Sequence, residues 1–159
     1  MSVDQLEFRR VMGHFATGVT IVTTHDGAGR LTGLTANAVS SVSLDPPMVL
    51  VCVDKSSESY PSFGASGVFA INILSKDQET LSRRFAKSGG DKFTGVGYRL
   101  GETGAPILND TIGFLECRVR HAFDAGDHTI YVGEAVDIGA APDGDPLLYF
   151  RGGYRNLSA

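Results

Sequence analysis

The spacing of apolar residues near the N-terminus predicts one amphipathic helix. Apolar side chains recur there at helical intervals, at Leu6, Phe8, Val11, Met12 and Phe15. A helix over residues 4–15 would carry an apolar face, and we expect that face to pack on the body of the protein. Ser2 and Gln5 have the spacing of a capping box at the start of this helix.

The pattern then changes to short β-branched and apolar runs, which predict strands. Residues 18–24 form the first strand, and turn residues at 25–30 return the chain as one long antiparallel strand over 31–43. Residues 48–53 form a third strand, whose apolar composition indicates burial on both faces. Further strands are predicted at residues 68–74, 114–123, 128–138 and 147–151.

Helical and loop segments are few. Ser75 and Gln78 form a second capping box, and the helix that follows has an apolar side that includes Phe85. Residues 87–104 are rich in Gly, Lys and Asp and predict a surface loop. About six or seven strands without a repeated strand–helix–strand order favour a mainly β fold. We expect a small antiparallel barrel with flanking helices, built as one domain over residues 1–159.

The bulk composition argues against several classes of function. The formal net charge is −4 and no run of Lys and Arg stands out, which disfavours nucleic acid or an anionic membrane as the main partner. No apolar run is long enough to cross a bilayer, and the N-terminus lacks the order of a signal peptide. Cys52 and Cys117 lie in apolar runs, so we expect reduced, buried thiols in a cytoplasmic protein.

The common nucleotide and metal motifs are missing from the sequence. The glycines of residues 95–101 have the wrong spacing for a dinucleotide fingerprint, and they follow a predicted loop rather than a strand. The histidines are scattered, and neither cysteine lies near a second soft ligand in the sequence. We therefore expect neither a Rossmann loop nor a metal site.

Polar side chains within the predicted long strand give the first indication of a ligand. Thr35, Asn37, Ser40, Ser41 and Ser43 place hydroxyls and an amide on an extended backbone. A core strand does not carry so many polar groups, because each one that is buried without a partner is costly. The pattern is typical either of a strand that contacts a polar, planar ligand or of a solvent-facing edge strand.

Two further segments carry candidate binding groups. Residues 54–57 place a cation, hydroxyls and loop amides directly after a buried strand, which suits a phosphate as well as an ordinary polar turn. His128 has the same strand parity as Ile130, which points it toward the buried side and a ligand. The alternative is that His128 and Asp127 only shape the turn. Gly133, within the same strand, indicates a bulge or a close backbone approach.

Three segments in a fixed order make the chain resemble the short-chain flavin reductase family, the reductase partners of two-component flavin monooxygenases. They are FRRVMGHFATGVTIVT at residues 8–23, GLTANAVSSVSLDPP at 33–47 and GDHTIYVGE at 126–134. The resemblance implies the FMN-binding split β-barrel of that family. It also implies a homodimer with the flavin held near the subunit interface.

The resemblance assigns the binding residues as well. The flavin ring, ribityl chain and phosphate are expected beside Thr35, Ala36, Asn37, Ser41, Val42, Cys52, Val53, Asp54, Lys55, Ser56 and Ser57. The phosphate or adenine side is expected at Phe85, Ala86 and Lys92, and the closing edge of the pocket at Tyr154 and Arg155. His128 is expected to orient the nicotinamide.

The activity implied is reduction of FAD or FMN by NADH, with NADPH as the other possible donor, and release of reduced flavin to a separate monooxygenase. Hydride transfer between two cofactor rings needs stacked rings but no protein acid, base or nucleophile. This requirement agrees with the missing catalytic motifs. The alternatives are a protein of the same barrel superfamily that stores or senses flavin, and an oxidoreductase that keeps its flavin as a prosthetic group.

Overall fold

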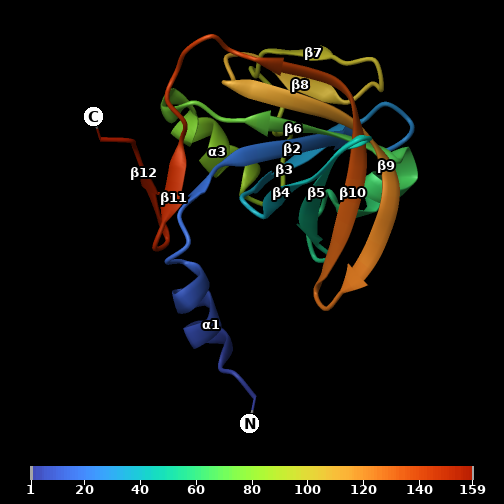
Figure 1. Ribbon diagram of the computed structural model, residues 1–159. Helices are drawn as coiled ribbons and strands as arrows, with labels where there is room; N and C mark the ends of the chain where they lie inside the picture. The colour runs from blue at the N-terminus through green and yellow to red at the C-terminus, as the bar shows by residue number, and fades with distance from the viewer. Residues whose placement is uncertain (1, 159) are drawn as a thin grey trace.

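The computed structural model describes residues 2–158 and is mainly β (Figure 1). The helices are α1 (Gln5–Met12), α2 (Tyr60–Ser66) and α3 (Glu79–Phe85), and a 3₁₀ turn at Lys76–Gln78 precedes α3. The strands are β1 (Thr17–Gly18), β2 (Thr20–His25), β3 (Leu31–Ala36), β4 (Val39–Leu44), β5 (Pro47–Asp54), β6 (Val68–Ile73), β7 (Tyr98–Leu100), β8 (Pro106–Leu108), β9 (Gly113–Ala125), β10 (His128–Ala140), β11 (Leu148–Phe150) and β12 (Gly153–Arg155). The prediction of a mainly β fold with few helices is confirmed.

A seven-stranded antiparallel sheet forms the centre of the molecule, in the order β3-β2-β6-β9-β10-β5-β4. Strands β1, β11 and β12 form a small second sheet, and β7 pairs with β8. Within residues 2–158 no ladder joins β3 to β4. The central sheet is therefore open between these two edges, as a split barrel is.

The single long strand predicted over residues 31–43 is wrong, because the chain breaks at Asn37 and Ala38 into β3 and β4. Strand β3 pairs with β2, whereas β4 pairs with β5 at the other edge of the sheet. The Cys52 amide donates a hydrogen bond to the Ala38 carbonyl at 3.0 Å, and this bond fastens the crossing chain to β5. The polar residues of this segment are therefore divided between the two edges.

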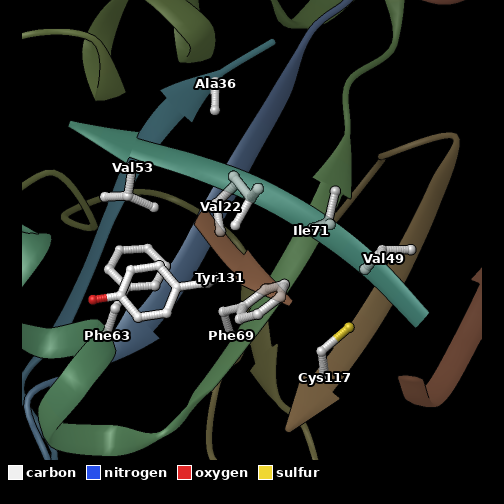
Figure 2. Packing of buried hydrophobic residues seen from close by; sticks show 10 residues of the cluster. Val22, Ala36, Val49, Val53, Phe63, Phe69, Ile71, Cys117 and Tyr131 are labelled. Atoms are coloured by element: carbon white, nitrogen blue, oxygen red, sulfur yellow. The ribbon is translucent and has the colours of Figure 1, made fainter. Parts of the chain in front are cut away.

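The main core is a cluster of strand side chains closed by Phe63 of α2 (Figure 2). The Phe63 ring stacks on Tyr131 with the ring centroids 5.4 Å apart. The other buried members of the cluster are Val22, Ala36, Val49, Val51, Val53, Phe69, Ile71 and Cys117. Aromatic rings thus fill the space between α2 and the sheet, where they anchor the helix.

Strand β5 buries only one of its two faces. Val49, Val51 and Val53 are buried, whereas the alternating residues 48, 50 and 52 are partly exposed. The predicted burial of both faces is wrong for the single chain, because composition alone does not say which face lies against a groove. Leu50 and Cys52 are consequently accessible to a ligand or to another chain.

Helix α1 forms close to where the sequence predicted it, but it does not pack on the body of its own chain. Asp4, rather than Ser2, caps it by accepting a hydrogen bond from the Glu7 amide at 2.9 Å. Figure 1 shows the helix projecting from one end of the molecule. None of its residues is buried, and Phe8 and Met12 are 59% and 51% exposed. The predicted docking is wrong because the segment that follows α1 directs the helix away from the sheet.

Gly133 marks a β-bulge at which β10 passes close to the core. The register between β10 and β9 shifts between Val132 and Gly133. A Cβ atom on Gly133 would lie 2.6 Å from the Phe69 ring and 2.8 Å from the Cβ atom of Cys117. The predicted bulge and close approach are therefore confirmed. Both neighbours are fully buried, so neither has room to move aside.

We expect Gly133→Ala to lower the free energy of unfolding by about 1–3 kcal/mol, because the added methyl group overpacks the core. Gly64→Ala is the matched control, since Gly64 lies in helix α2 and an added Cβ would meet nothing within 4 Å. Its stability should stay the same or rise, because Ala favours a helix more than Gly does. Urea unfolding followed by circular dichroism measures both variants. Wild-type stability in Gly133→Ala would contradict the overpacking.

Candidate ligand-binding site

Seven of the predicted binding residues line one small groove, which has a volume of about 270 Å³ and which we call the polar groove. Its walls come from β3, from the loop after β5 and from the end of α3 with the loop that follows. The lining residues are Leu34, Thr35, Asp54, Ser56, Ser57, Glu58, Phe85, Ala86, Lys87, Ser88 and Lys92. The structure thus brings together segments that lie far apart in the sequence.

Lys92 is the best-placed cation in the polar groove. Its ammonium donates hydrogen bonds to the carbonyls of Phe85 and Gly33, at 3.2 and 3.4 Å. An ammonium has three N–H donors, so one donor is left for a ligand. Burial lowers the pKa of Lys92, and the nearby Glu58 carboxylate opposes that shift. The side chain therefore presents a fixed, partly desolvated donor to an anion in the groove.

Asp54 shapes the loop at the end of β5. Its carboxylate accepts hydrogen bonds from the hydroxyl and the backbone N–H of Ser56, both at 2.7 Å, and these bonds hold the pKa of Asp54 below its usual range. The Ser57 amide donates to the Asp54 carbonyl at 3.1 Å. Asp54 is thus an anion satisfied within its own loop. The lining side chains suited to a phosphate are those of Ser57, Lys87, Ser88 and Lys92.

A partly buried hydrogen-bond chain positions the end of β3 against α3. The Thr35 hydroxyl donates to the Ser82 carbonyl at 2.6 Å, and the hydroxyls of Ser82 and Tyr154 lie 2.7 Å apart. Ser82 is fully buried. Sequence reasoning missed it, although a serine on the apolar side of a predicted helix is a signal for such a bond. Tyr154 itself lines a small separate groove that borders the polar groove at Ala86 and Lys87.

A larger groove, with a volume of about 1010 Å³, contains two more of the predicted residues, Asn37 and Cys52. We call it the apolar groove. Its lining includes Phe8, Met12, Phe15, Thr17, Ser40, Leu50, Ile71, Ile73, Leu115 and Tyr149. Sequence reasoning had singled out Ser40 as a polar strand residue but missed the others, most of which belong to an ordinary apolar pattern of their own element. The Thr17 hydroxyl oxygen is buried and has no hydrogen-bond partner among residues 2–158.

The two grooves have no lining residue in common, but two stretches of the chain run from one groove to the other. Thr35 lines the polar groove and Asn37 lines the apolar groove. Asp54 and Cys52 repeat this arrangement on β5. On β5, residues two apart point to the same side, so Cys52 and Asp54 form one continuous wall, whereas Asn37 lies just past the end of β3. This arrangement suits a ligand with a flat, largely apolar body and an anionic tail.

Among the predicted binding residues that lie outside both grooves, four belong to β3, β4 and β5. Ala36 and Val53 are buried in the core cluster. Ser41 and Val42 are exposed on β4, which is an edge strand of the central sheet. Their expected contacts with a flavin stay predictions.

Lys55 and Arg155 have other partners in the structure. The Lys55 ammonium pairs with the Asp124 carboxylate and donates to the Gly126 carbonyl at 2.7 Å, which ties the loop after β5 to the tip of the β9–β10 hairpin. The Arg155 guanidinium donates to the Tyr154 carbonyl at 3.0 Å. Neither cation lines the polar groove.

His128 lies beside the site but lines neither groove. It pairs across the ladder with Asp54, and its Nδ1 lies 2.7 Å from the Asp127 carboxylate. The prediction that its strand parity points it toward the core is wrong, because the buried residues at this end of β10 are Thr129 and Tyr131. Apolar residues occupy both faces of β10, so alternation alone could not choose between them. His128 is 38% exposed on the face opposite the core.

The two cysteines are free thiols. Burial, and then the neighbouring Glu116 carboxylate, raise the pKa of Cys117 to about 12, so this thiol is protonated at neutral pH. Within the described part of the chain, no three His, Cys, Asp or Glu residues come together as a metal site. Among residues 2–158 there is also no helix with the length and apolarity needed to span a membrane.

The fold, an open and mainly β sheet with flanking helices, is shared by a solved flavin reductase. The chain belongs to the family of the flavin reductase like domain, whose family model matches residues 12–158. A probable flavin reductase of Rhizobium meliloti is 45% identical over 95% of this chain, which spans only 48% of that protein's length. The reductase subunit HsaB of a flavin-dependent monooxygenase from Mycobacterium tuberculosis is 36% identical, over 98% of this chain and 83% of that protein.

A solved structure supports the same assignment. The NADH:FAD oxidoreductase SgcE6 of Streptomyces globisporus, in complex with NAD and FAD fragments, superposes with a TM-score of 0.92. Its sequence is 38% identical to this one, and the alignment covers 98% of this chain and 93% of that chain. At this level of identity the likeness extends to the sequence as well as to the fold, in agreement with the family match.

Proposed function

We propose that this protein is an NADH-dependent flavin reductase, which transfers a hydride from the reduced nicotinamide to FAD or FMN. The observation that carries the proposal is that residues two apart in the chain line a polar groove and an apolar groove, at Thr35 and Asn37 and at Asp54 and Cys52. The names of the related proteins point to the same activity.

The side chains that line the two grooves are suited to a flavin. The apolar groove offers Leu50 and Cys52 to a flat ring, with the Asn37 amide as a polar group at its edge. The polar groove offers the third donor of Lys92 and the Ser57 side chain to a phosphate. When bound, the flavin supplies the electron-accepting ring. The residues of this chain hold and orient it and need not move a proton.

We also propose that the reduced flavin leaves for a separate flavin-dependent monooxygenase, since the Mycobacterium relative is named as the reductase subunit of one. Two free thiols agree with a reducing compartment, and we infer that the protein works in the cytoplasm. NADH is the expected donor, because the Streptomyces neighbour is named as an NADH enzyme, and NADPH is the donor to compare with it.

The test of the activity is steady-state oxidation of NADH and NADPH, followed at 340 nm with and without added FMN or FAD. We expect turnover that requires added flavin and saturates with it. Turnover without added flavin would identify a retained prosthetic group instead. Binding of flavin without turnover with either nicotinamide would contradict the proposal and favour storage or sensing.

His128 is the residue that we propose to orient the nicotinamide. His128 is partly exposed and lies beside Asp54 at the end of β5. Its imidazole is therefore next to the polar groove and outside the core. The contact with Asp127 fixes the ring without using both of its nitrogens. An imidazole held in this way can contact a second ring that stacks on the flavin.

We expect His128→Ala to weaken NADH binding about tenfold, which corresponds to about 1.4 kcal/mol of binding free energy. The flavin affinity should stay unchanged. Stopped-flow reduction of bound flavin over a range of NADH concentrations measures the nicotinamide affinity and the limiting rate. His121→Ala is the control, because His121 lies on the same hairpin and stacks on Phe123. If the NADH affinity and the limiting rate of flavin reduction are unchanged in His128→Ala, the residue only shapes the turn and the proposed role is wrong.

A homodimer is the assembly that we propose for the active protein. Helix α1 has no buried residue, and its Phe8 and Met12 line the apolar groove together with the β5 residue Leu50. An exposed apolar surface of this kind marks an interaction site. A second copy related by two-fold symmetry would present an identical helix and groove, so each chain could cover the other.

We expect Phe8→Asp to raise the dimer dissociation constant about 100-fold or more, because the interface would have to bury a carboxylate among apolar groups. Arg10→Ala is the control, since Arg10 pairs with the exposed Glu7 and does not line the groove. Sedimentation velocity over a concentration series measures both variants. A monomeric wild-type protein, or a dimer that is unaffected by Phe8→Asp, would contradict this assembly.

A further inference from the structure

Lys55 is a cation beside the candidate site that the proposed function leaves without a role. It directly follows Asp54, the last residue of β5, yet its side chain lines neither the polar nor the apolar groove. Its ammonium instead pairs with the carboxylate of Asp124, which lies near the tip of the β9–β10 hairpin. The contacts of Lys55 therefore concern the hairpin rather than a ligand phosphate.

The tip of the β9–β10 hairpin has no buried residue to hold it in place. Residues 120–127 are all exposed, and the turn that joins the two strands lies at the far end of the hairpin (Figure 1). Gly126 in this turn has a φ of 64°, a conformation that glycine adopts readily. An exposed tip of this kind opens easily unless polar contacts fix it to the rest of the chain.

Lys55 supplies three such contacts. Its ammonium pairs with the Asp124 carboxylate and donates a hydrogen bond to the Gly126 carbonyl at 2.7 Å. Its backbone N–H donates to the Asp127 carbonyl at 3.0 Å. The hydrogen bond to Asp124 raises the pKa of Lys55, so the side chain is a cation at neutral pH. One residue thus holds both a side chain and the backbone of the tip.

The held segment leads directly into His128. The carboxylate of Asp127, whose carbonyl Lys55 holds, lies 2.7 Å from the Nδ1 atom of His128. His128 also pairs across the ladder with Asp54, the chain neighbour of Lys55. A displacement of the tip would therefore move Asp127 and change the orientation of the imidazole.

We propose that Lys55 and Asp124 are positioning residues, which hold His128 in the orientation that contacts the nicotinamide. This inference rests on the proposed function, because the two residues act through His128 and touch neither cofactor themselves. It requires that breaking the ion pair weakens NADH binding and leaves flavin binding as it is.

The exposure of the ion pair makes this role separable from the stability of the fold. The side chains of Lys55 and Asp124 are 34% and 82% exposed. An ion pair this open to solvent contributes little to global stability. Its loss should therefore release the hairpin tip without unfolding the protein.

The test is to break the pair from each side, with Lys55→Met and Asp124→Asn. Both variants should raise the dissociation constant for NADH about threefold to fivefold, the size of effect that an exposed ion pair allows. Stopped-flow reduction of bound flavin over a range of NADH concentrations measures this constant. The two substitutions change the local charge in opposite directions. A Lys55 that attracted anionic NADH directly would give weaker binding in Lys55→Met and tighter binding in Asp124→Asn, and that result would overturn the inference.

The same two substitutions are then made together with His128→Ala. Neither should weaken NADH binding further, because the side chain that they position is already absent. A full additional loss in that background would show that Lys55 and Asp124 act independently of His128, and it would also overturn the inference.

Lys76→Met is the matched control. Lys76 forms an exposed ion pair with Asp145 at 3.0 Å and lines neither the polar nor the apolar groove, so its loss should leave NADH affinity unchanged. A loss equal to that of Lys55→Met would mean that the effect is not specific to the hairpin tip.

Titration with FMN and with riboflavin, in the absence of NADH, separates positioning from phosphate binding. Both affinities should be unchanged in Lys55→Met. Weaker binding of FMN with unchanged binding of riboflavin would make Lys55 a phosphate ligand and overturn the inference. A wild-type protein without NADH turnover would contradict the proposed function itself, whereas normal turnover with unaffected variants would overturn this inference alone.

Discussion

The chain has to cross from one edge of the central sheet to the other at Asn37 and Ala38, and the candidate site depends on that crossing. The hydrogen bond from the Cys52 amide to the Ala38 carbonyl fixes where the crossing meets β5. Because β3 and β4 pair at opposite edges, the sheet is open between them, and the walls that begin at Thr35 and Asp54 face a groove rather than a core. If residues 31–43 formed one continuous strand, the polar side chains of that segment would all lie along a single edge of the sheet.

Much of the fold could be predicted because each strand has its own local signal. The hairpin of β9 and β10, the strand β6 and the start of the helix after Ser75 lie close to the predicted ranges, since apolar runs and turn residues mark them. Most residues of the polar groove could also be predicted. Seven residues assigned to it by resemblance come together, because the segments that carry them are structural elements with fixed neighbours.

The errors arise where a local pattern has more than one three-dimensional solution. An amphipathic helix can place its apolar face on its own chain or on another, and the sequence of α1 is the same in both cases. Strand parity failed for His128 because apolar residues occupy both faces of β10, and the bulge at Gly133 resets the alternation. Lys55 resembled a phosphate ligand until the distant Asp124 was placed beside it. Pairings of this kind depend on the tertiary fold and leave no local signature.

In the proposed homodimer, the apolar groove would connect assembly to flavin binding. Its lining combines Phe8 and Met12 of α1 with Leu50 and Cys52 of β5, so the proposed dimer and the proposed flavin site would use the same surface. A flavin that contacts residues ordered by the dimer binds the dimer more tightly than the monomer. By linkage the dimer is then stabilised by the flavin to the same extent.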